Sequence, residues 1–308
     1  MILALAGGVG GARLANGLVA VLPDDQLTIV VNTGDDSEHL GLSISPDLDT
    51  VCYTLAGINN LDQGWGIANE SWSLMGAIER LGGDTWFRLG DQDVATHLMR
   101  TMMLRDAPLS AVTSFIAGRL GINHRIVPMS DDPVRSMIET DQGVLAFQDY
   151  FVRHPAEPRF LSIRLEGVEC AKPSPALLDG LENPDLQAVI ICPSNPVLSI
   201  TPILAVGGVR ERLMASSAPV VAVSPFIDGR AVKGPAAKIM IELGRATTTE
   251  GVIEYYDGLL DGILVHSEES RGLTAEGVAV WSCNTLMASD ADQQRLARES
   301  LAFASSLR

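Results

Sequence analysis

The chain has 308 residues, 46% hydrophobic and 19% charged, which is typical of a globular protein with a large core and excludes a disordered chain. Its formal net charge of −16 argues against a nucleic-acid-binding protein, because such proteins need a basic surface. The same charge repels anionic ligands, so a phosphate site would need local cations or a metal.

The first predicted strand, residues 1–6, ends in a cluster of glycines. Gly7-Gly8-Val9-Gly10-Gly11 leads into a predicted helix over residues 12–22. A strand that breaks into glycines before a helix presents backbone N–H groups to a phosphate. The cluster lacks the last glycine of the dinucleotide fingerprint and the Gly-Lys-Ser/Thr of a P-loop. It therefore predicts a nucleotide or diphosphate ligand without naming one, and a plain tight turn is the alternative.

The second predicted strand, residues 27–32, runs into Asp35 and Asp36. Further along, Asp49 or Thr50 is expected to cap a helix, because an apolar run follows them. The acidic set of this chain comprises Asp35, Asp36, Asp47, Asp49, Asp91 and Asp93. Carboxylates at strand and helix ends suit a hard ion such as Mg²⁺. Capping and turn formation are the alternatives for each residue singly, but an acidic chain gains nothing by clustering carboxylates unless a cation binds there.

Between residues 64 and 121 the sequence changes to helix-period segments without a clear strand. We predict three helices there, at residues 69–81, 92–104 and 110–119. Asn69 and Ser110 are expected to cap two of them. Arg88 follows an aromatic patch of this segment and could pair with a phosphate or with Asp91.

The second half of the chain returns to strand-like sequence. Short runs at residues 124–127, 143–148 and 160–164 predict extensions of the sheet or a small β-flap. Buried strands are expected at residues 188–192, 219–223 and 263–266. A helix should begin at Thr201-Pro202, and a surface helix should close the chain at residues 290–306.

Two loops of this half are candidates for ligand contact. Ser194 and Asn195 follow a predicted buried strand. Two of the three lysines, Lys233 and Lys238, lie in one short segment together with Gly234. They would supply local cations to an acidic chain, and chance placement on an exposed helix start is the alternative.

These elements predict an α/β fold with a Rossmann-like parallel sheet core, helices on both faces and a helical insertion that caps the ligand cleft. The core is expected from residues 1–62 and 122–308, with the helical insertion at 63–121 and a small β extension near 122–165. Ligands of such sheets bind outside the carboxyl ends of the strands, where the loops described above would meet.

Several other kinds of protein are excluded or disfavoured. No apolar run reaches the ~18 residues of a membrane span, and no basic segment precedes the N-terminal apolar stretch, so we expect a cytoplasmic protein. The four cysteines form no C-x-x-C pair and are expected to be reduced. His97 is expected to be structural, and no nucleophile motif for acyl chemistry is present.

A series of ordered motifs resembles one known family from Met1 to about His266. The motifs are Gly7–Arg13, Val31–Asp36, Asp47–Thr50, Tyr53–Gly57, Gly64–Gly66, Phe87–Asp93 with Ala95–His97, Pro193–Pro196 with Ser199–Ile200, Ser224–Pro225 and Lys233–Lys238. Together they are similar to the 2-phospho-L-lactate transferase family of coenzyme F-420 biosynthesis.

The resemblance implies a transferase with two substrates. It would move a 2-phospholactyl, phosphoenolpyruvyl or 3-phosphoglyceryl group from a guanosine-diphosphate-linked donor to the ribityl hydroxyl of the deazaflavin Fo, releasing GMP. It also implies a divalent metal, normally Mg²⁺, and a role for Asp49 and Arg88, with Thr50 beside them, in holding Fo. We further expect a homodimer, without nucleic-acid or membrane partners.

Each part of the predicted site has a set of residues. The nucleotide and its diphosphate would contact Gly8, Val9, Gly10, Gly11, Arg13, Ser194, Asn195, Lys233 and Gly234. Asp35 and Asp49 would bind Mg²⁺, and either could be the general base. Two departures from the family pattern bear on these residues: Arg13 stands where many relatives have lysine, and Asp228 adds a negative charge near Lys233.

Two other functions compete with this interpretation. Regulators of the related gluconeogenesis-factor family share the glycine loop and the fold but bind nucleotide sugars without catalysis. The presence of Asp49, Arg88 and the segment Gly64-Trp65-Gly66 favours the transferase. An NAD(P)-dependent oxidoreductase requires the full dinucleotide fingerprint, which the chain lacks.

Overall fold

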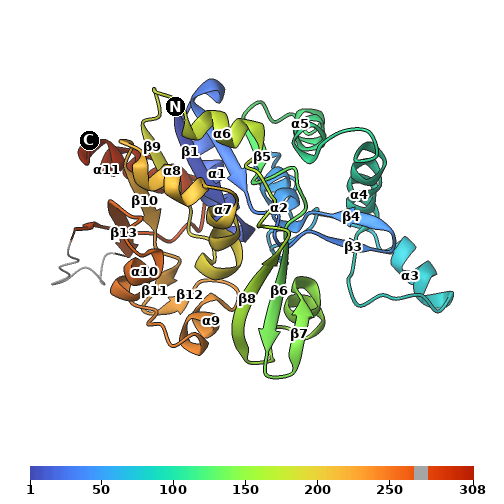
Figure 1. Ribbon diagram of the computed structural model, residues 1–308. Coiled ribbons are helices and arrows are strands. Elements are labelled where there is room, and N and C mark those ends of the chain that lie inside the picture. Colours follow the sequence, from blue (N-terminus) through green and yellow to red (C-terminus); the bar gives the residue numbers. More distant parts are fainter. Residues whose placement is uncertain (267–276) are drawn as a thin grey trace.

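Seven parallel strands form the central sheet of the computed structural model, which describes residues 1–266 and 277–308 (Figure 1). In the order in which they pair, the strands are β14 (Ala279–Cys283), β13 (Gly262–His266), β10 (Val220–Val223), β9 (Ala188–Ile191), β1 (Ile2–Ala6), β2 (Leu27–Val31) and β5 (Arg125–Pro128). This sheet, covered by helices on both faces, confirms the predicted α/β class.

The central strands are short apolar runs because both of their faces are buried. Every residue of β1, β2, β9 and β10 is buried. Successive side chains point to opposite faces, so Ile2 and Ala4 enter one hydrophobic core and Leu3 and Leu5 enter the other. The predicted strands in these regions are confirmed.

Two groups of helices cover the two faces of the sheet. Beside the core that contains Ile2 lie α1 (Gly8–Val19), α2 (Pro46–Leu55), α5 (Leu109–Arg119) and α11 (Asp290–Ser306). Beside the other core lie α6 (Pro175–Leu181), the π-helical turn η3 (Pro196–Ile200), α7 (Thr201–Ala205), α8 (Val209–Ala215), α9 (Ala236–Glu242) and α10 (Thr249–Tyr256). A capping box of Ser289 and Asp292 begins α11, and the predicted closing helix is confirmed.

A second, antiparallel sheet lies beyond the carboxyl edge of the first (Figure 1). It consists of β7 (Gly143–Ala146), β6 (Arg135–Thr140) and β8 (Phe160–Glu166), with the π-helical turn η2 (Asp149–Arg153) between β7 and β8. All three predicted runs are confirmed as strands: those at residues 143–148 and 160–164 form β7 and β8 of this second sheet, and the run at residues 124–127 extends the main sheet as its edge strand β5. The sequence did not predict β6.

The helical insertion lies on the side of the molecule away from α11 (Figure 1). It contains α3 (Ser73–Arg80), α4 (Asp91–Met103) and α5, and α4 packs on the hairpin of β3 (Ser37–His39) and β4 (Leu42–Ile44). The remaining short elements are η1 (Asp24–Gln26), β11 (Phe226–Ile227) and β12 (Arg230–Ala231). The predicted division of the chain at residues 63 and 122 stays a prediction.

The three helices predicted in the insertion are present, and two of them start within one residue of the predicted position, but the predicted caps are wrong. Asn69 has a φ of +57° and lies outside α3, and Ser110 lies inside α5, where it donates to Asp131. Instead, α3 and α4 cap each other. The Asp91 carboxylate accepts hydrogen bonds from the first N–H groups of α3, and Glu70, which precedes α3, accepts from the first N–H groups of α4.

Two other predicted starts differ from the structure, and a third agrees with it. The first helix begins at Gly8 instead of residue 12, so the glycine cluster is the helix start itself. Ser45 precedes α2, which places Asp49 and Thr50 inside the helix and not at its cap. The helix predicted to begin at Thr201-Pro202 is confirmed as α7, and the π-helical turn η3 precedes it, with the Asn195 side chain accepting hydrogen bonds from the N–H groups of Val197 and Leu198.

None of the helices among the described residues is both long and apolar enough to cross a bilayer.

Candidate functional site

The glycines at the start of α1 allow neighbouring loops to pack against its first turn. A Cβ on Gly10 would collide with the carbonyl oxygen of Pro193, in the loop after β9. A Cβ on Gly7 would collide with the Asp47 carboxylate and would lie 2.7 Å from the Ser199 Cβ. The glycines therefore bring α1, the start of α2 and the loop after β9 together at the carboxyl edge of the sheet.

Two N–H groups of this turn donate to neighbouring loops, and the next two have no acceptor within the helix. Gly8 donates its N–H to Asp47 Oδ1 at 2.6 Å, and Gly7 donates to Ser194 Oγ at 3.0 Å. The N–H groups of Val9 and Gly10 belong to the first helical turn, where no acceptor within the helix can reach them. The turn thus has the donors and the positive helix end that an anionic ligand needs.

Three aspartates, Asp35, Asp36 and Asp47, form what we call the carboxylate cluster beside this turn. Asn32, the residue after β2, donates its side-chain amide to Asp35 Oδ1 at 3.1 Å and to Asp47 Oδ2 at 2.9 Å. Ser45 donates to Asp36 Oδ2 at 2.9 Å. All three carboxylates are buried. One amide group therefore holds two buried carboxylates side by side.

The electrostatics of the carboxylate cluster are unfavourable without a cation. Burial, and then repulsion by Asp47 and Asp36, raise the pKa of Asp35 well above its usual value. Burial raises the pKa of Asp47 to about 6, and it raises that of Asp36 to about 7 against the opposing charges of Arg135 and Arg100. Among the described residues, none of the three forms an ion pair.

The second sheet is anchored to the same loop. Ser136 of β6 donates its N–H to the carbonyl oxygen of Gly34 at 2.7 Å, and the Gln148 side chain donates to the carbonyl oxygen of Asp35 at 2.9 Å. The carboxylate cluster is thus held between the main sheet and the second sheet.

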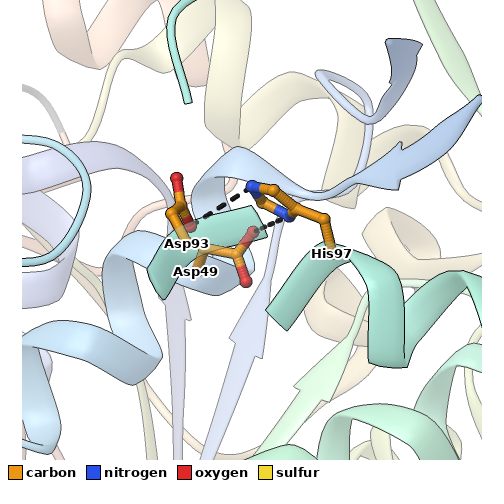
Figure 2. A group of neighbouring side chains, drawn as sticks. All are labelled: Asp49, Asp93 and His97. Carbon is orange, nitrogen blue, oxygen red and sulfur yellow. Dashed lines mark ion pairs between the residues drawn. The ribbon is translucent and has the colours of Figure 1, made fainter. Parts of the chain in front are cut away.

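A second group of acidic residues lies nearby but is built differently. Figure 2 shows Asp49 of α2 and Asp93 and His97 of α4 pointing toward one another. His97 Nδ1 lies 3.6 Å from Asp49 Oδ2, and His97 Nε2 lies 3.2 Å from Asp93 Oδ1. Arg100 donates to Asp49 Oδ2 at 3.0 Å and also pairs with Oδ1. We call these four buried residues the Arg100 network.

The Arg100 network neutralises its own carboxylates. Burial acts to raise the pKa of Asp93, but the hydrogen bond and charge of His97, a hydrogen bond from Tyr53 and the charge of Arg100 hold it below its usual value. The acidic oxygens and the imidazole lie within 4.8 Å of one another, close enough to hold a metal ion, but the Arg100 guanidinium already pairs with Asp49. The expectation that His97 is structural agrees with these contacts.

These contacts bear on the predicted metal ligands. Asp35 shares Asn32 with Asp47, whereas Asp49 is paired with Arg100. That Asp35 and Asp49 bind one Mg²⁺ stays a prediction, and the contacts favour Asp47 as the partner of Asp35. Thr50, the residue after Asp49, lines a small hollow of about 10 Å³ together with Val9 and Arg13 of the predicted nucleotide site and with Gly64.

The predicted nucleotide-binding residues are brought only partly together. Ser194 contacts the glycine turn directly, while Asn195 caps the following turn. A Cβ on Gly64 would collide with Lys233 Nζ and would lie 3.7 Å from a Val9 methyl, so Lys233 reaches the glycine turn from the opposite half of the chain. Gly234 follows with a φ of +73°. Arg13 donates to the carbonyl oxygen of Met287 at 3.0 Å.

Arg88 is exposed and packs on an aromatic side chain of the helical insertion. Its guanidinium carbon lies 4.3 Å from the ring centroid of Trp72, which in turn packs edge-on against Trp65. Within the described ranges it forms no ion pair with Asp91, which caps α3 instead. Its role in holding Fo stays a prediction.

Four contacts of the acidic residues were not predicted from the sequence. Asn32 and Asp47 are partners of Asp35. Tyr53 is a partner of Asp93, and Arg100 is a partner of Asp49. A signal existed for two of them. Asn32 directly follows the buried strand β2. Arg100 stands seven residues after Asp93, on the same face of an α-helix.

Comparison with known proteins adds independent findings. The family model described as 2-phospho-L-lactate transferase CofD matches residues 2–302 of this chain. The chain is 42% identical over 318 aligned positions to a phosphoenolpyruvate transferase of Kitasatospora aureofaciens, covering 100% of the chain and 98% of that protein. It is 41% identical over 301 positions to a 2-phospho-L-lactate transferase of Methanopyrus kandleri, covering 96% and 95% respectively.

A solved structure shares the fold. It is the crystal structure of a UPF0052 family member from Bacillus halodurans, with a TM-score of 0.63 and 16% identity, covering 97% of this chain and 98% of that one. At this identity the likeness concerns the fold alone.

Proposed function

Because the chain belongs to the 2-phospho-L-lactate transferase family, we propose that it transfers a phospho-three-carbon-acid group in coenzyme F-420 biosynthesis. The donor would be linked to guanosine diphosphate, the acceptor would be the ribityl hydroxyl of the deazaflavin Fo, and GMP would leave. The family match confirms the predicted resemblance and the transferase class. It gives no support to the alternative of a non-catalytic regulator.

The observation that carries the proposal is the contact between the α1 glycine turn and the carboxylate cluster. The turn offers N–H donors to a diphosphate, and Lys233 adds a positive charge beside Val9. Asp47 joins the two parts, because its carboxylate accepts from both Gly8 and Asn32. Phosphoryl transfer needs alignment and neutralisation of charge more than covalent help from the protein, and this arrangement suits both needs.

The carboxylate cluster fits the implied Mg²⁺. Asp35 and Asp47 offer paired, buried carboxylate oxygens with raised pKa values and no ion-pair partner in the described part of the chain, and Asn32 orients both. Such hard oxygen ligands are the ones that Mg²⁺ prefers. When bound, the ion would neutralise negative charge on the diphosphate oxygens.

The proposed reaction needs a proton acceptor near the acceptor hydroxyl. The hydroxyl oxygen forms a bond to the phosphorus that carries the acid, the bond from this phosphorus to the bridging oxygen breaks, and GMP leaves with that oxygen. The hydroxyl proton passes to a carboxylate. Asp35 and Asp49 are the sequence candidates, and Asp36 joins them because its Oδ1 has no hydrogen-bond partner among the described residues.

The identity of the three-carbon acid is the open part of the proposal. Relatives named phosphoenolpyruvate transferase and relatives named 2-phospho-L-lactate transferase match this chain about equally, at 42% and 41% identity. Overall similarity therefore does not choose between the acids.

Mass spectrometry of the product tests the proposal. The purified chain would be incubated with Mg²⁺, Fo and, in separate reactions, the lactyl, enolpyruvyl and glyceryl guanylylated donors. We expect a phosphodiester of Fo from at least one donor, with one GMP released for each product. Asp47→Asn serves as the matched inactive control. Absence of any Fo phosphodiester with all three donors would contradict the proposal.

The predicted homodimer and cytoplasmic location remain parts of the proposal. An apolar stripe on α4, with Leu98, Met99 and Met102 each more than two-fifths exposed, continues to Phe115 on α5. We propose this uncharged stripe as the contact surface of the homodimer, because burying it in a second copy removes apolar surface from water. Light scattering after size-exclusion chromatography would show a dimer that Met99→Glu converts to a monomer.

A further inference from the structure

Helix α9 lies beside β8 of the second sheet, and two of its charged side chains reach that sheet (Figure 1). Lys238 donates to the carbonyl oxygen of Pro158 at 3.0 Å and to Glu242 Oε2 at 2.7 Å. Glu242 Oε2 also accepts the N–H of Phe160, the first residue of β8, at 2.9 Å. We call Lys238 and Glu242 the α9 clamp. It joins segments that are 80 to 82 residues apart in the chain.

The α9 clamp acts where the second sheet is irregular. The pairing of β6 with β8 shifts between Glu139 and Thr140, at the point where Thr140 faces Phe160. Such an irregularity disrupts the backbone ladder, and here Glu242 supplies the acceptor for the Phe160 N–H. The Lys238 and Glu242 side chains are only 37% and 19% exposed, so their ion pair is less screened than one on the open surface. The position of β8 therefore depends on α9 as well as on its own sheet.

The two ends of the clamp lead to the two sides of the proposed reaction centre. On one side, Lys233 lies in the segment that runs into α9, and it reaches the glycine turn, where the diphosphate of the donor is proposed to bind. On the other side, the second sheet holds the loop of the carboxylate cluster. Ser136 donates its N–H to the carbonyl oxygen of Gly34, and the Gln148 side chain donates to that of Asp35. A shift of α9 relative to β8 would therefore move both sides relative to each other.

A second donor for Glu242 lies in the same core. Tyr150 of η2 packs edge-on against the ring of Phe160, with the centroids 6.1 Å apart. Its hydroxyl is buried and has no hydrogen-bond partner within residues 1–266 and 277–308. Burial and the charge of Glu242 raise the pKa of Tyr150 to about 12, so the hydroxyl keeps its proton and can donate. Buried polar groups are nearly always paired, so this unpaired donor indicates a second position for the Glu242 carboxylate.

We propose that the α9 clamp is a positioning device that couples binding of the donor to binding of the acceptor. When Glu242 accepts from Lys238 and Phe160, the donor side and the second sheet are held in the arrangement that both substrates need. When Glu242 accepts from Tyr150 instead, the two sides are released from each other. The first substrate to bind selects the clamped arrangement, so the second binds more tightly. The inference rests on the proposed function, since it concerns the two substrates of that reaction.

Equilibrium binding measured without turnover tests the coupling. Fo fluorescence would give the Kd of Fo with and without saturating GDP and Mg²⁺, and calorimetry would give the Kd of GDP with and without Fo. The coupling factor is the ratio of the two Kd values, and it must be the same from both directions. We expect it to be about 5- to 10-fold in the wild type.

Glu242→Ala should reduce the coupling factor to less than about 2-fold, because α9 and β8 are then no longer joined. Each ligand alone should bind within about 3-fold of the wild-type affinity, which also shows that the variant is folded. Lys238→Arg keeps the charge and the donors and should keep most of the coupling. A merely structural role of the clamp would lower Tm and leave the coupling factor unchanged.

Two further variants separate the clamp from other causes. Tyr150→Phe removes the second donor for Glu242, so the free chain should already be clamped and should bind Fo about 3-fold tighter without GDP. Glu299→Ala is the matched control, because Glu299 forms an ion pair of the same i,i+4 spacing with Arg295 on α11. It should keep the wild-type coupling factor.

Three outcomes would overturn the inference and leave the transfer reaction intact. In the first, GDP and Fo bind to the wild type independently. In the second, Glu242→Ala keeps the wild-type coupling factor, or Glu299→Ala loses as much of it. In the third, Tyr150→Phe binds Fo without GDP as the wild type does, which would remove the second position of Glu242. A chain that forms no phosphodiester of Fo from any donor would instead overturn the proposed function, whatever the coupling factor.

Discussion

Two clusters of buried aspartates lie close together in this molecule. The protein neutralises the buried charge of one cluster, and it leaves the charge of the other without an ion-pair partner among the described residues. In the Arg100 network the protein supplies its own cation, so the acids are paired and the pKa of Asp93 is held low. In the carboxylate cluster the acids have no ion-pair partner in the described chain, and their pKa values are raised.

The difference separates a structural role from a functional one. Buried charges persist when they are paired, and a pair supplied within the protein has no need of a ligand. Carboxylates that burial and mutual repulsion destabilise gain most from a cation brought from outside. By this reasoning the Arg100 network links the helical insertion to α2, and we propose the carboxylate cluster as the site of the ion that the proposed reaction needs.

The largest expected effect comes from removing the cation of the Arg100 network. Arg100→Met should lower the free energy of unfolding by about 3–5 kcal/mol, because Asp49 would remain buried and unpaired. Urea denaturation measures it. Arg105→Met, at an exposed position just after α4, should change stability by less than about 0.5 kcal/mol. A loss below about 1 kcal/mol for Arg100→Met would show that the network is not a stabilising unit.

The matching change in the carboxylate cluster should affect catalysis instead. Asp47→Asn keeps an acceptor for the Gly8 N–H but removes a charge, so we expect turnover to fall about 10²- to 10³-fold at saturating donor and Mg²⁺. Without a divalent ion, its stability should equal or exceed that of the wild type, since a repulsive charge is gone. Wild-type turnover of Asp47→Asn, or a large loss of its stability, would show that the two clusters do not differ in role.

The pH dependence of stability should also separate them. The folded-state pKa values of Asp36 and Asp47, about 7 and about 6, lie above the unfolded value of 3.8. The folded chain therefore binds more protons in this range, and in the presence of EDTA its unfolding free energy should fall as pH rises from about 4 to 7. Saturating Mg²⁺ should raise Tm by about 5 °C at pH 8 and by much less at pH 5. Equal shifts at both pH values would argue against an ion on these carboxylates.

The smallest predicted effect concerns the cation across the glycine turn. Lys233→Met should raise the KM for the donor about 10-fold through loss of one charge contact, with a smaller change in kcat. Lys172→Met, at an exposed lysine outside the site, should leave both constants unchanged. An unchanged KM in the Lys233 variant would show that Lys233 does not contact the donor.

The same contrast explains what could be predicted from the sequence. Buried parallel strands such as β9 and β10 are continuous apolar runs, and α11 has a local capping box, so both are visible without tertiary information. In contrast, β6 alternates buried and half-buried residues in a short polar run, and its pairing with β8 decides its structure. The caps of α3 and α4 come from acids about 20 residues away, which local patterns cannot reveal.

The same limit applies to the site: residues at strand ends were predictable, and partners set by tertiary packing were not. The glycine turn and Asp35 stand at strand ends, so their place at the carboxyl edge follows from the fold class. The distinction between Asp47 and Asp49 does not, because it depends on Arg100, which is 51 residues from Asp49 in the chain. Two aspartates of one helical turn thus receive different partners that only the packing of α4 determines.

Titration of Mn²⁺ into three forms of the chain, followed by calorimetry, tests the central claim most directly. The claim predicts that the wild type and Asp93→Asn each bind one ion with similar affinity, and that Asp47→Asn loses this binding. Retained binding in Asp47→Asn together with loss in Asp93→Asn would contradict it and would place the ion in the Arg100 network.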